Sequence, residues 1–329
     1  MFQSSEHVHQ ALTDVGYITD TVTATAVYLA ANLQKPLLLE GPAGSGKTEL
    51  AYAVAHAIGT PLERLQCYEG ITEEKAIGKF DEGLQRLYLD TVTRGAGASD
   101  WASLGKQLSA LDFFAAGPLL KALQYPSPCV LLIDELDKVD HSFEATLLEV
   151  LSVFRLSVPR LGTITAASIP FTVLTSNEER RLGDPIRRRS LYVRVEHPSA
   201  EREGEIVARR TPEAGAPAHR LIAGFAKALR AYSLEKPPSV SEMIDMALSL
   251  QHLGIDEISN EHRDMLLPLL AKTVMSHGDI WGFFHGVEGT ILLSLASVIF
   301  ALLIATILGC IFGCVGITRH EGQNPPLNF

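Results

Sequence analysis

The sequence predicts an α/β fold in which helices cover both faces of a parallel sheet, and three observations support this prediction. Nearly continuous apolar runs at Pro36–Leu39, Val130–Ile133 and Phe171–Leu174 are typical of strands that are buried on both faces. Stretches with helical periodicity lie between these runs, and a glycine-rich loop follows the first of them. Such alternation of strands and helices is the pattern of a three-layer α/β domain.

Two weaker strand candidates complete the predicted sheet. Leu62–Cys67 and Leu191–Val195 mix polar with apolar residues, so we expect both to lie nearer the edges of the sheet. Thr48–Ile58 and Phe143–Phe154 are the expected helices that best show a 3.6-residue period. A link rich in glycine, alanine and serine at Gly95–Ser99 indicates a flexible insertion before the strand that begins at Val130.

The α/β pattern ends at Pro198–Ser199, which divides the chain. Residues 1–198 form the predicted α/β domain, and residues 199–280 show only helical periodicity. The second part is therefore expected to be a smaller, all-helical domain. Its candidate helices are Ala200–Arg210, Ala218–Leu229 and Ser241–Leu253.

After a linker, residues 281–288, the chain enters a long apolar block. Residues 289–317 contain no charged side chain in 29 positions, and about 20 apolar residues suffice to cross the hydrocarbon core of a bilayer. We therefore predict a transmembrane helix here, with a short tail at residues 318–329. The alternatives are a buried core helix, which seldom stays apolar on every side over such a length, and a fusion junction.

Composition and charge restrict the class of protein. The chain has 329 residues, 47% of them hydrophobic, which excludes a disordered chain. Its 28 Lys+Arg and 38 Asp+Glu give a net charge of −10, and this acidic balance argues against nucleic-acid binding. No cationic leader is present in the first thirty residues. We expect a cytoplasmic globular part that residues 289–317 anchor to the inner membrane.

The strongest functional signal is a phosphate-binding loop. The sequence GPAGSGKT follows the first strand and precedes a helix, as the pattern G-x-x-x-x-G-K-[ST] requires. In such loops backbone N–H groups and the helix N-terminus face the phosphates, the lysine reaches the β- and γ-phosphates, and the hydroxyl ligates Mg²⁺. The cofactors are thus predicted to be ATP and Mg²⁺. The predicted nucleotide-binding residues are Gly41, Pro42, Ala43, Gly44, Ser45, Gly46, Lys47 and Thr48.

Two adjacent acids follow the next buried strand. In CVLLIDELDK the apolar run places Asp134 and Glu135 at the carboxyl edge of the sheet, where open α/β sheets bind ligands. Two acids there are costly unless one holds a metal ion and the other handles a proton. We assign Asp134 to the Mg²⁺ shell and Glu135 to the polarisation of the attacking water.

Polar residues after the later strands extend this predicted site. Asn177, in FTVLTSNEER, follows an apolar run and is expected to orient the water or to sense the γ-phosphate. Three consecutive arginines, Arg187, Arg188 and Arg189, precede the last strand. They form either a solvated face or a reach toward phosphate, and a guanidinium donated to a neighbour's γ-phosphate would stabilise charge in trans. Arg188 and Arg189 are the candidates, and the sequence does not choose between them.

These four motifs in this order resemble the AAA+ ATPases. LQCYEG, GPLLKAL, FEATLLEVLS, RRRSLY and LEKPPSV narrow the resemblance to the MoxR group and its CoxD-like branch, which is tied to carbon monoxide dehydrogenase maturation. The resemblance covers roughly residues 5–280. It implies a five-stranded core with a helical lid, a hexameric ring, and remodelling of a metalloenzyme client together with a von Willebrand factor A domain partner.

One departure from the family leaves an alternative function open. Ser241, Glu242 and Met243 stand where many AAA+ proteins place a second sensor arginine, so closure of the lid on ATP is expected to be weaker or to use another cation. A nucleotide-gated, membrane-tethered scaffold with little turnover is therefore the alternative. A small-molecule kinase would leave the arginines unexplained. No Asn-Lys-x-Asp guanine reader is present, which disfavours a GTPase.

Overall fold

The computed structural model describes residues 1–95, 101–216, 218–219, 222–223 and 239–254, which belong to two compact units, Met1–His197 and Pro198–Phe329. The linker, the transmembrane helix and the tail expected at residues 281–329 lie outside the described residues, as does most of the helix expected at Ala218–Leu229. Among the helices that the structure describes, none combines the length and the hydropathy that a membrane crossing requires.

The first unit contains a five-stranded sheet in the order β2-β5-β8-β1-β9, and every neighbouring pair is parallel. The two mixed polar–apolar runs form β2 and β9, which are the edge strands, as their composition predicts. The central strands are buried along their whole length. The bounds are β1 Leu37–Glu40, β2 Leu62–Gln66, β5 Val130–Asp134, β8 Phe171–Ser176 and β9 Leu191–Arg194.

Three strands continue further than the apolar runs. The sequence places the ends at Leu39, Ile133 and Leu174, whereas the strands end one or two residues later, at polar residues. Ladder hydrogen bonds explain the difference, because the N–H of Cys67 donates to the carbonyl of Asp134 at 2.9 Å. Asp134 is thus part of a strand and not of the loop after it.

Helices cover both faces of the sheet because alternate residues of each strand point in opposite directions. Leu131 and Ile133 of β5 pack in one apolar cluster with helices α7 and α8. Val130 and Leu132, from the same strand, pack in a second cluster with α1, α2 and α3. The bounds are α1 Ser5–Asp14, α2 Thr21–Leu33, α3 Lys47–Ile58, α4 Glu73–Ala76, α7 Pro118–Gln124, α8 His141–Val153 and α9 Asp184–Arg189.

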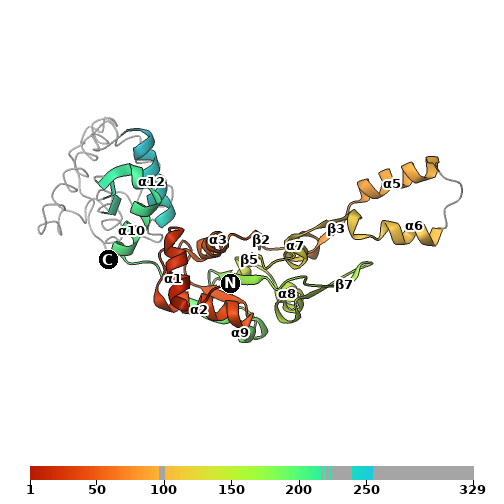
Figure 1. The fold of residues 1–329 in the computed structure, drawn as a ribbon, viewed down its shortest axis with the longest axis horizontal. Coiled ribbons are helices and arrows are strands. Elements are labelled where there is room, and N and C mark those ends of the chain that lie inside the picture. The colour runs from red at the N-terminus through yellow and green to blue at the C-terminus, as the bar shows by residue number, and fades with distance from the viewer. Residues whose placement is uncertain (96–100, 217, 220–221, 224–238, 255–329) are drawn as a thin grey trace, which may run out of the picture. The chain divides into compact units, whose positions relative to one another are not determined.

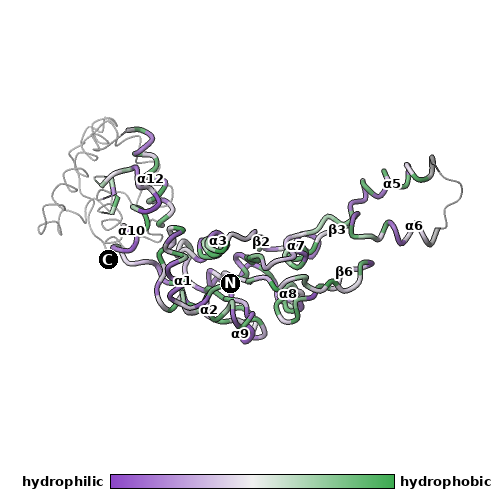
Figure 2. Tube along the Cα trace, viewed as in Figure 1, coloured by the Kyte–Doolittle hydropathy of each residue, from purple (hydrophilic) through white to green (hydrophobic). Residues whose placement is uncertain are grey.

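Two excursions leave this three-layer body. Strands β3 (Gly78–Phe80) and β4 (Phe114–Ala116) form an antiparallel ribbon that leads to helices α5 (Glu82–Gly95) and α6 (Trp101–Leu108), and this arm extends away from the sheet (Figure 1). Both helices of the arm carry hydrophobic as well as hydrophilic positions (Figure 2). The insertion expected before the Val130 strand is thus a helical arm, and residues 96–100 between its two helices lie outside the described residues.

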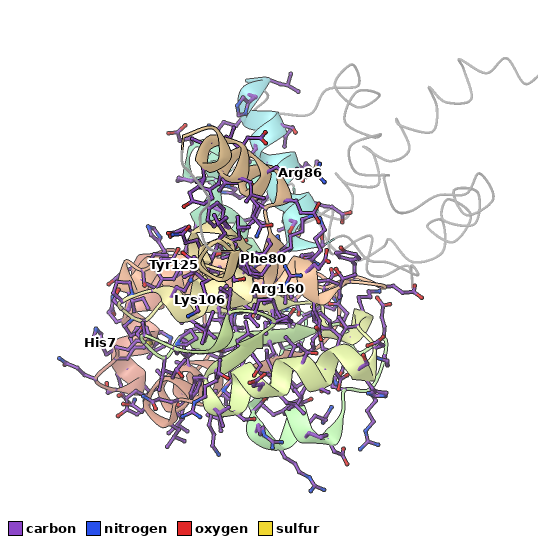
Figure 3. All side chains as sticks on the ribbon, turned by 90° about the vertical axis from the view of Figure 1, so that its right-hand side faces the viewer. His7, Phe80, Arg86, Lys106, Tyr125 and Arg160 are labelled. Carbon is purple, nitrogen blue, oxygen red and sulfur yellow. The ribbon has the colours of Figure 1, made fainter. Side chains whose placement is uncertain are left out.

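The second excursion is a hairpin that contacts the base of the arm. It consists of β6 (Arg155–Val158) and β7 (Gly162–Thr165). Arg160, at its turn, places its guanidinium 5.8 Å from the ring centroid of Phe80 on β3, and Figure 3 shows the two side chains close together. Phe80 also packs edge-on against Phe114 of β4. The hairpin and the arm are therefore joined by an aromatic cluster.

The described part of the second unit is helical, with α10 at Ala200–Arg210 and α12 at Val240–His252. Val207 of α10 is buried in one cluster with Met246 and Leu250 of α12. A capping box starts α12, because the Ser239 hydroxyl accepts from the N–H of Glu242 while the Glu242 carboxylate accepts from the N–H of Ser239.

Candidate functional site

The phosphate-binding loop joins β1 to α3 in a conformation that requires glycine. A Cβ atom at Gly41 would lie 2.0 Å from the carbonyl oxygen of Val195, so no other residue fits there without displacing the backbone after β9. Gly46, the N-cap of α3, has a φ of 89°, in the left-handed region. The loop therefore wraps closely around the start of α3, as the glycine pattern predicts.

Lys47 lies inside the curve of this loop. Its Nζ donates to the carbonyls of Gly41 at 2.8 Å and Pro42 at 2.7 Å, and to the hydroxyl of Ser45 at 3.5 Å. The residue is only 5% exposed. Burial lowers the pKa of Lys47, and four acids act in the opposite direction: Asp137, Asp134, Glu178 and Glu135. An ammonium group buried beside turned backbone amides is the donor set that a triphosphate requires.

Asp134 brings the two main motifs together. The Thr48 hydroxyl donates to Oδ1 of Asp134 at 2.9 Å across 86 positions of sequence, and the Thr175 hydroxyl donates to the same oxygen at 2.6 Å. Arg64 on β2 donates to Oδ2 from Nε at 3.1 Å and from Nη2 at 2.6 Å. A hydroxyl and a carboxylate at this separation are hard oxygen ligands of the kind Mg²⁺ takes. The residues present thus fit a bound Mg²⁺–nucleotide.

Glu135 follows directly in an uncommon conformation. Its φ is 56° and ψ 47°, the left-handed region, which few non-glycine residues adopt. Its N–H donates to the Thr175 hydroxyl at 2.9 Å. Thr175 therefore bonds to Asp134 and to the backbone of Glu135 through one oxygen that is almost completely buried. Backbone strain of this kind gathers at functional sites.

Asn177 lies one residue beyond the end of β8, half-buried, next to Glu178, which also has a positive φ of 64°. Glu179 ties this loop to the turn after Asp134, because its N–H donates to Oδ2 of Asp137 at 3.0 Å and its carboxylate pairs with Lys138. The loops after β5 and β8 are thus bonded to each other at the carboxyl edge of the sheet.

The three arginines of α9 have different surroundings. Arg187 donates to both oxygens of the buried Glu40, at 3.0 and 2.9 Å, and lies over the ring of Tyr192. Arg188 and Arg189 are exposed. The Arg189 side chain donates to the carbonyl of Pro185, whereas the Arg188 side chain makes no hydrogen bond or ion pair within the described part of the chain.

Their place in the topology separates them from the other motifs. Helix α9 ends at Arg189 and β9 begins at Leu191, so the exposed arginines lie at the amino end of β9. Asp134 lies at the carboxyl end of β5 in the same parallel sheet. The sheet therefore unites the phosphate loop, Asp134, Glu135 and Asn177, but not Arg188 and Arg189.

Two residues around Asp134 have no counterpart in the sequence prediction. Arg64 lies in β2, whose sequence alternates irregularly between polar and apolar residues, and no motif in the sequence includes this arginine. Thr175 is part of an apolar run and resembles a buried β-branched residue. Thr175 could have been identified only from its place in the strand next to the one that ends at Asp134, and the sequence does not give the strand order.

Comparisons with known proteins agree with this geometry. Residues 36–190 match the family model described as AAA domain (dynein-related subfamily). An uncharacterized protein of Staphylococcus haemolyticus is 26% identical over 172 residues, which are 50% of this chain and 57% of the relative. One from Staphylococcus epidermidis is 25% identical over 176 residues. The chain thus spans little more than half the length of the curated relatives it matches.

The solved structures that the chain matches include two of Thermotoga maritima RuvB. One is a mutant, with 16% identity, coverage of 96% of this chain and 84% of that chain, and a TM-score of 0.43. The other is the RuvB Holliday junction branch migration motor, with 16% identity, coverage of 95% and 82%, and a TM-score of 0.42.

The match of the family model begins at the residue before β1 and ends at the residue after α9, so it includes the phosphate loop, both acids, Asn177 and the arginines. Residues 36–190 are accordingly similar to the AAA domain of the dynein-related subfamily, and this similarity supports an ATPase site that uses ATP with Mg²⁺.

Proposed function

We propose that the chain is a MoxR-type AAA+ ATPase that hydrolyses ATP in order to remodel or mature a client protein complex. The observation that carries the proposal is the hydrogen bond between Thr48 and Asp134, which joins the phosphate loop to the acidic motif at the carboxyl edge of the sheet. The MoxR group is favoured by the stretches LQCYEG, FEATLLEVLS and RRRSLY, which accompany these motifs.

Each residue at this edge has a proposed role. Thr48 and Asp134 would hold Mg²⁺, which when bound offsets the negative charge of the phosphates. Lys47 binds the β- and γ-phosphates. Glu135, half-buried beside Asp134, accepts a proton from the attacking water. Asn177 has an amide that orients this water without adding charge.

The exposed arginines of α9 complete the site in a second copy of the chain. Helix α9 ends at Arg189 before the amino end of β9, whereas Asp134 lies at the carboxyl end of β5, and this separation supports a role for Arg188 or Arg189 in a neighbouring subunit. A guanidinium offered in trans stabilises the charge of the transferred phosphoryl group. We propose a ring, in family terms a hexamer, in which each subunit donates an arginine to the next.

The test of the hydrolytic role is Glu135→Gln. The variant retains the shape of the side chain but loses its basicity, so ATP binding should persist while kcat falls about a hundredfold to ten-thousandfold. Phosphate release and binding of a fluorescent ATP analogue measure the two quantities. Glu74→Gln, at an exposed position on α4, is the matched control. Wild-type turnover in Glu135→Gln would overturn the assignment of the base.

The proposal also includes a client, a partner protein and a membrane attachment. By resemblance the client is a metalloenzyme of the carbon monoxide dehydrogenase type, and a von Willebrand factor A domain protein assists. The cytoplasmic domain would be anchored to the inner membrane through residues 289–317. Capture of both proteins by Glu135→Gln with ATP tests the first point. Release of the full chain by alkaline carbonate would contradict the anchor.

A second candidate function is a nucleotide-gated scaffold with little turnover. It is favoured by the start of α12, where Glu242 closes the capping box and Met243 is buried against α10, so neither side chain can act as a sensor of ATP. Partner binding that depends on ATP but is the same in Glu135→Gln as in wild type, together with negligible phosphate release, would favour the scaffold.

A further inference from the structure

The carboxylate of Asp134 is bonded on both oxygens by groups of its own chain. Oδ1 accepts from two hydroxyls, those of Thr48 and Thr175, and Oδ2 accepts two N–H groups of Arg64. Only 3% of the Asp134 side chain is exposed. A buried carboxylate without partners is costly, so the guanidinium offsets its charge when no metal ion does.

Arg64 differs from the other partners in being free to leave. Its side chain is 42% exposed, whereas Thr175 is almost completely buried. Strand β2 is an edge strand, and Arg64 pairs with Leu132 in the register, two positions before Gln66 pairs with Asp134. The guanidinium therefore reaches along the strand from the open edge of the sheet. A rotation about the side-chain bonds takes it into solvent without moving the backbone.

The charge of Arg64 is permanent. A guanidinium stays protonated in proteins, and the Asp134 carboxylate lies 2.6 Å from Nη2 of Arg64. Arg64 also contacts the side chain of Gln66 through Nη2 and interacts with Tyr52 of α3. The guanidinium of Arg64 therefore remains charged while it contacts Asp134. A divalent cation that binds the same carboxylate must compete with this positive charge.

We propose that Arg64 is a positioning residue that acts as a built-in counter-ion: it occupies Oδ2 of Asp134 when the metal is absent and is released when Mg²⁺ binds with ATP. Arg64 thereby keeps Asp134 oriented in the empty site and lowers the affinity for the metal. The inference rests on the metal role proposed for Asp134. In this proposal the affinity for the metal depends on Arg64, in an edge strand, as well as on the phosphate loop.

The experiment measures Mn²⁺ binding to the full chain without free nucleotide, which would itself chelate the metal, by the loss of the free Mn²⁺ signal in electron paramagnetic resonance. Arg64→Gln should bind Mn²⁺ about fivefold more tightly than wild type, the size expected for the loss of one partly exposed ion pair. Arg64→Lys, which retains the charge but not the two parallel N–H groups, should lie between them. Arg86→Gln removes one charge from the exposed pair with Glu82 on α5 and should match wild type.

Two further measurements separate the possible failures. Thermal unfolding without metal should show each variant folded, since Arg64 is partly exposed. Affinity for ATP in EDTA should be equal in wild type and Arg64→Gln. Weaker ATP binding there would place Arg64 on the phosphates and overturn the inference, as would Mn²⁺ affinity that is unchanged or weaker.

Asp134→Asn distinguishes this inference from the function on which it rests. If Asp134→Asn loses Mn²⁺ while Arg64→Gln equals wild type, only the role of Arg64 is wrong. If Asp134→Asn binds Mn²⁺ as wild type does, the metal role of Asp134 is wrong and the role of Arg64 is overturned with it.

Discussion

Two charged regions of the first unit, Met1–His197, differ in how their side chains are paired. Lys47 and Asp134 are buried, and each is held by several partners from its own chain. On α9, Arg188 and Arg189 are exposed, and the Arg188 side chain lacks any hydrogen bond or ion pair in the described residues. This difference supports the proposal that one chain supplies the phosphate-binding residues, whereas Arg188 or Arg189 serves a second copy of the chain.

The largest expected effect tests the exposed arginines of α9, Arg188 and Arg189. Replacing the correct one of Arg188 and Arg189 by alanine should lower the ATP turnover of the assembled ring about a thousandfold, since a guanidinium in trans stabilises the transition state, and should leave ATP affinity unchanged. Phosphate release and equilibrium binding measure the two. Arg181→Ala is the control, because its pair with Asp184 is exposed. If both single variants turn over normally, the assignment to α9 fails.

The next largest effect concerns the buried lysine of the phosphate loop, Lys47. Lys47→Ala removes the ammonium that lies inside the phosphate loop, so ATP affinity should fall about a hundredfold, as expected for lost hydrogen bonds to a charged ligand. Isothermal titration with ATP measures it. Lys35→Ala, an exposed lysine just before β1, should bind ATP normally. If Lys47→Ala and Lys35→Ala bound ATP with equal affinity, Lys47 would have no role in nucleotide binding.

A third prediction sharpens the contrast within α9 itself. Arg187→Ala leaves the buried Glu40 carboxylate without its partner, so the free energy of unfolding should drop by about 2 kcal/mol, less than for a fully buried pair because 35% of the Arg187 side chain is exposed. Urea unfolding measures the change. Arg188→Ala should unfold like wild type. An equal loss in both variants would show that the two arginines are not distinct.

The smallest effect is a dependence on pH near Asp134. Burial raises the pKa of Cys67 to about 12. The thiol ionises first in the unfolded chain, so its contribution to stability is complete below about pH 9 and is lost as the pH rises toward 12. Between pH 8 and pH 10, wild type should lose about 1 kcal/mol more than Cys67→Ala in urea unfolding. An identical loss in both proteins would contradict the buried-thiol environment.

The sequence and the structure agree best where a residue's role follows from its immediate neighbours. The phosphate loop, the two acids and Asn177 each follow an apolar run, so their position at strand ends was predictable. The five-stranded parallel sheet and the positions of its edge strands follow from the same pattern, since only strands covered on both faces stay apolar throughout.

Pairings across the sheet could not be predicted in this way. Thr175 and Arg64 meet Asp134 because β8 and β2 lie on either side of β5, an order that the chain sequence does not state. Likewise, only the pairing of Arg187 with Glu40 separates that arginine from the two after it. The sequence by itself determined which groups are candidates to bind the phosphates, because a loop and a strand end are local features of the chain. Their partners were decided by the tertiary structure, since strand order and burial bring together residues that are far apart along the chain.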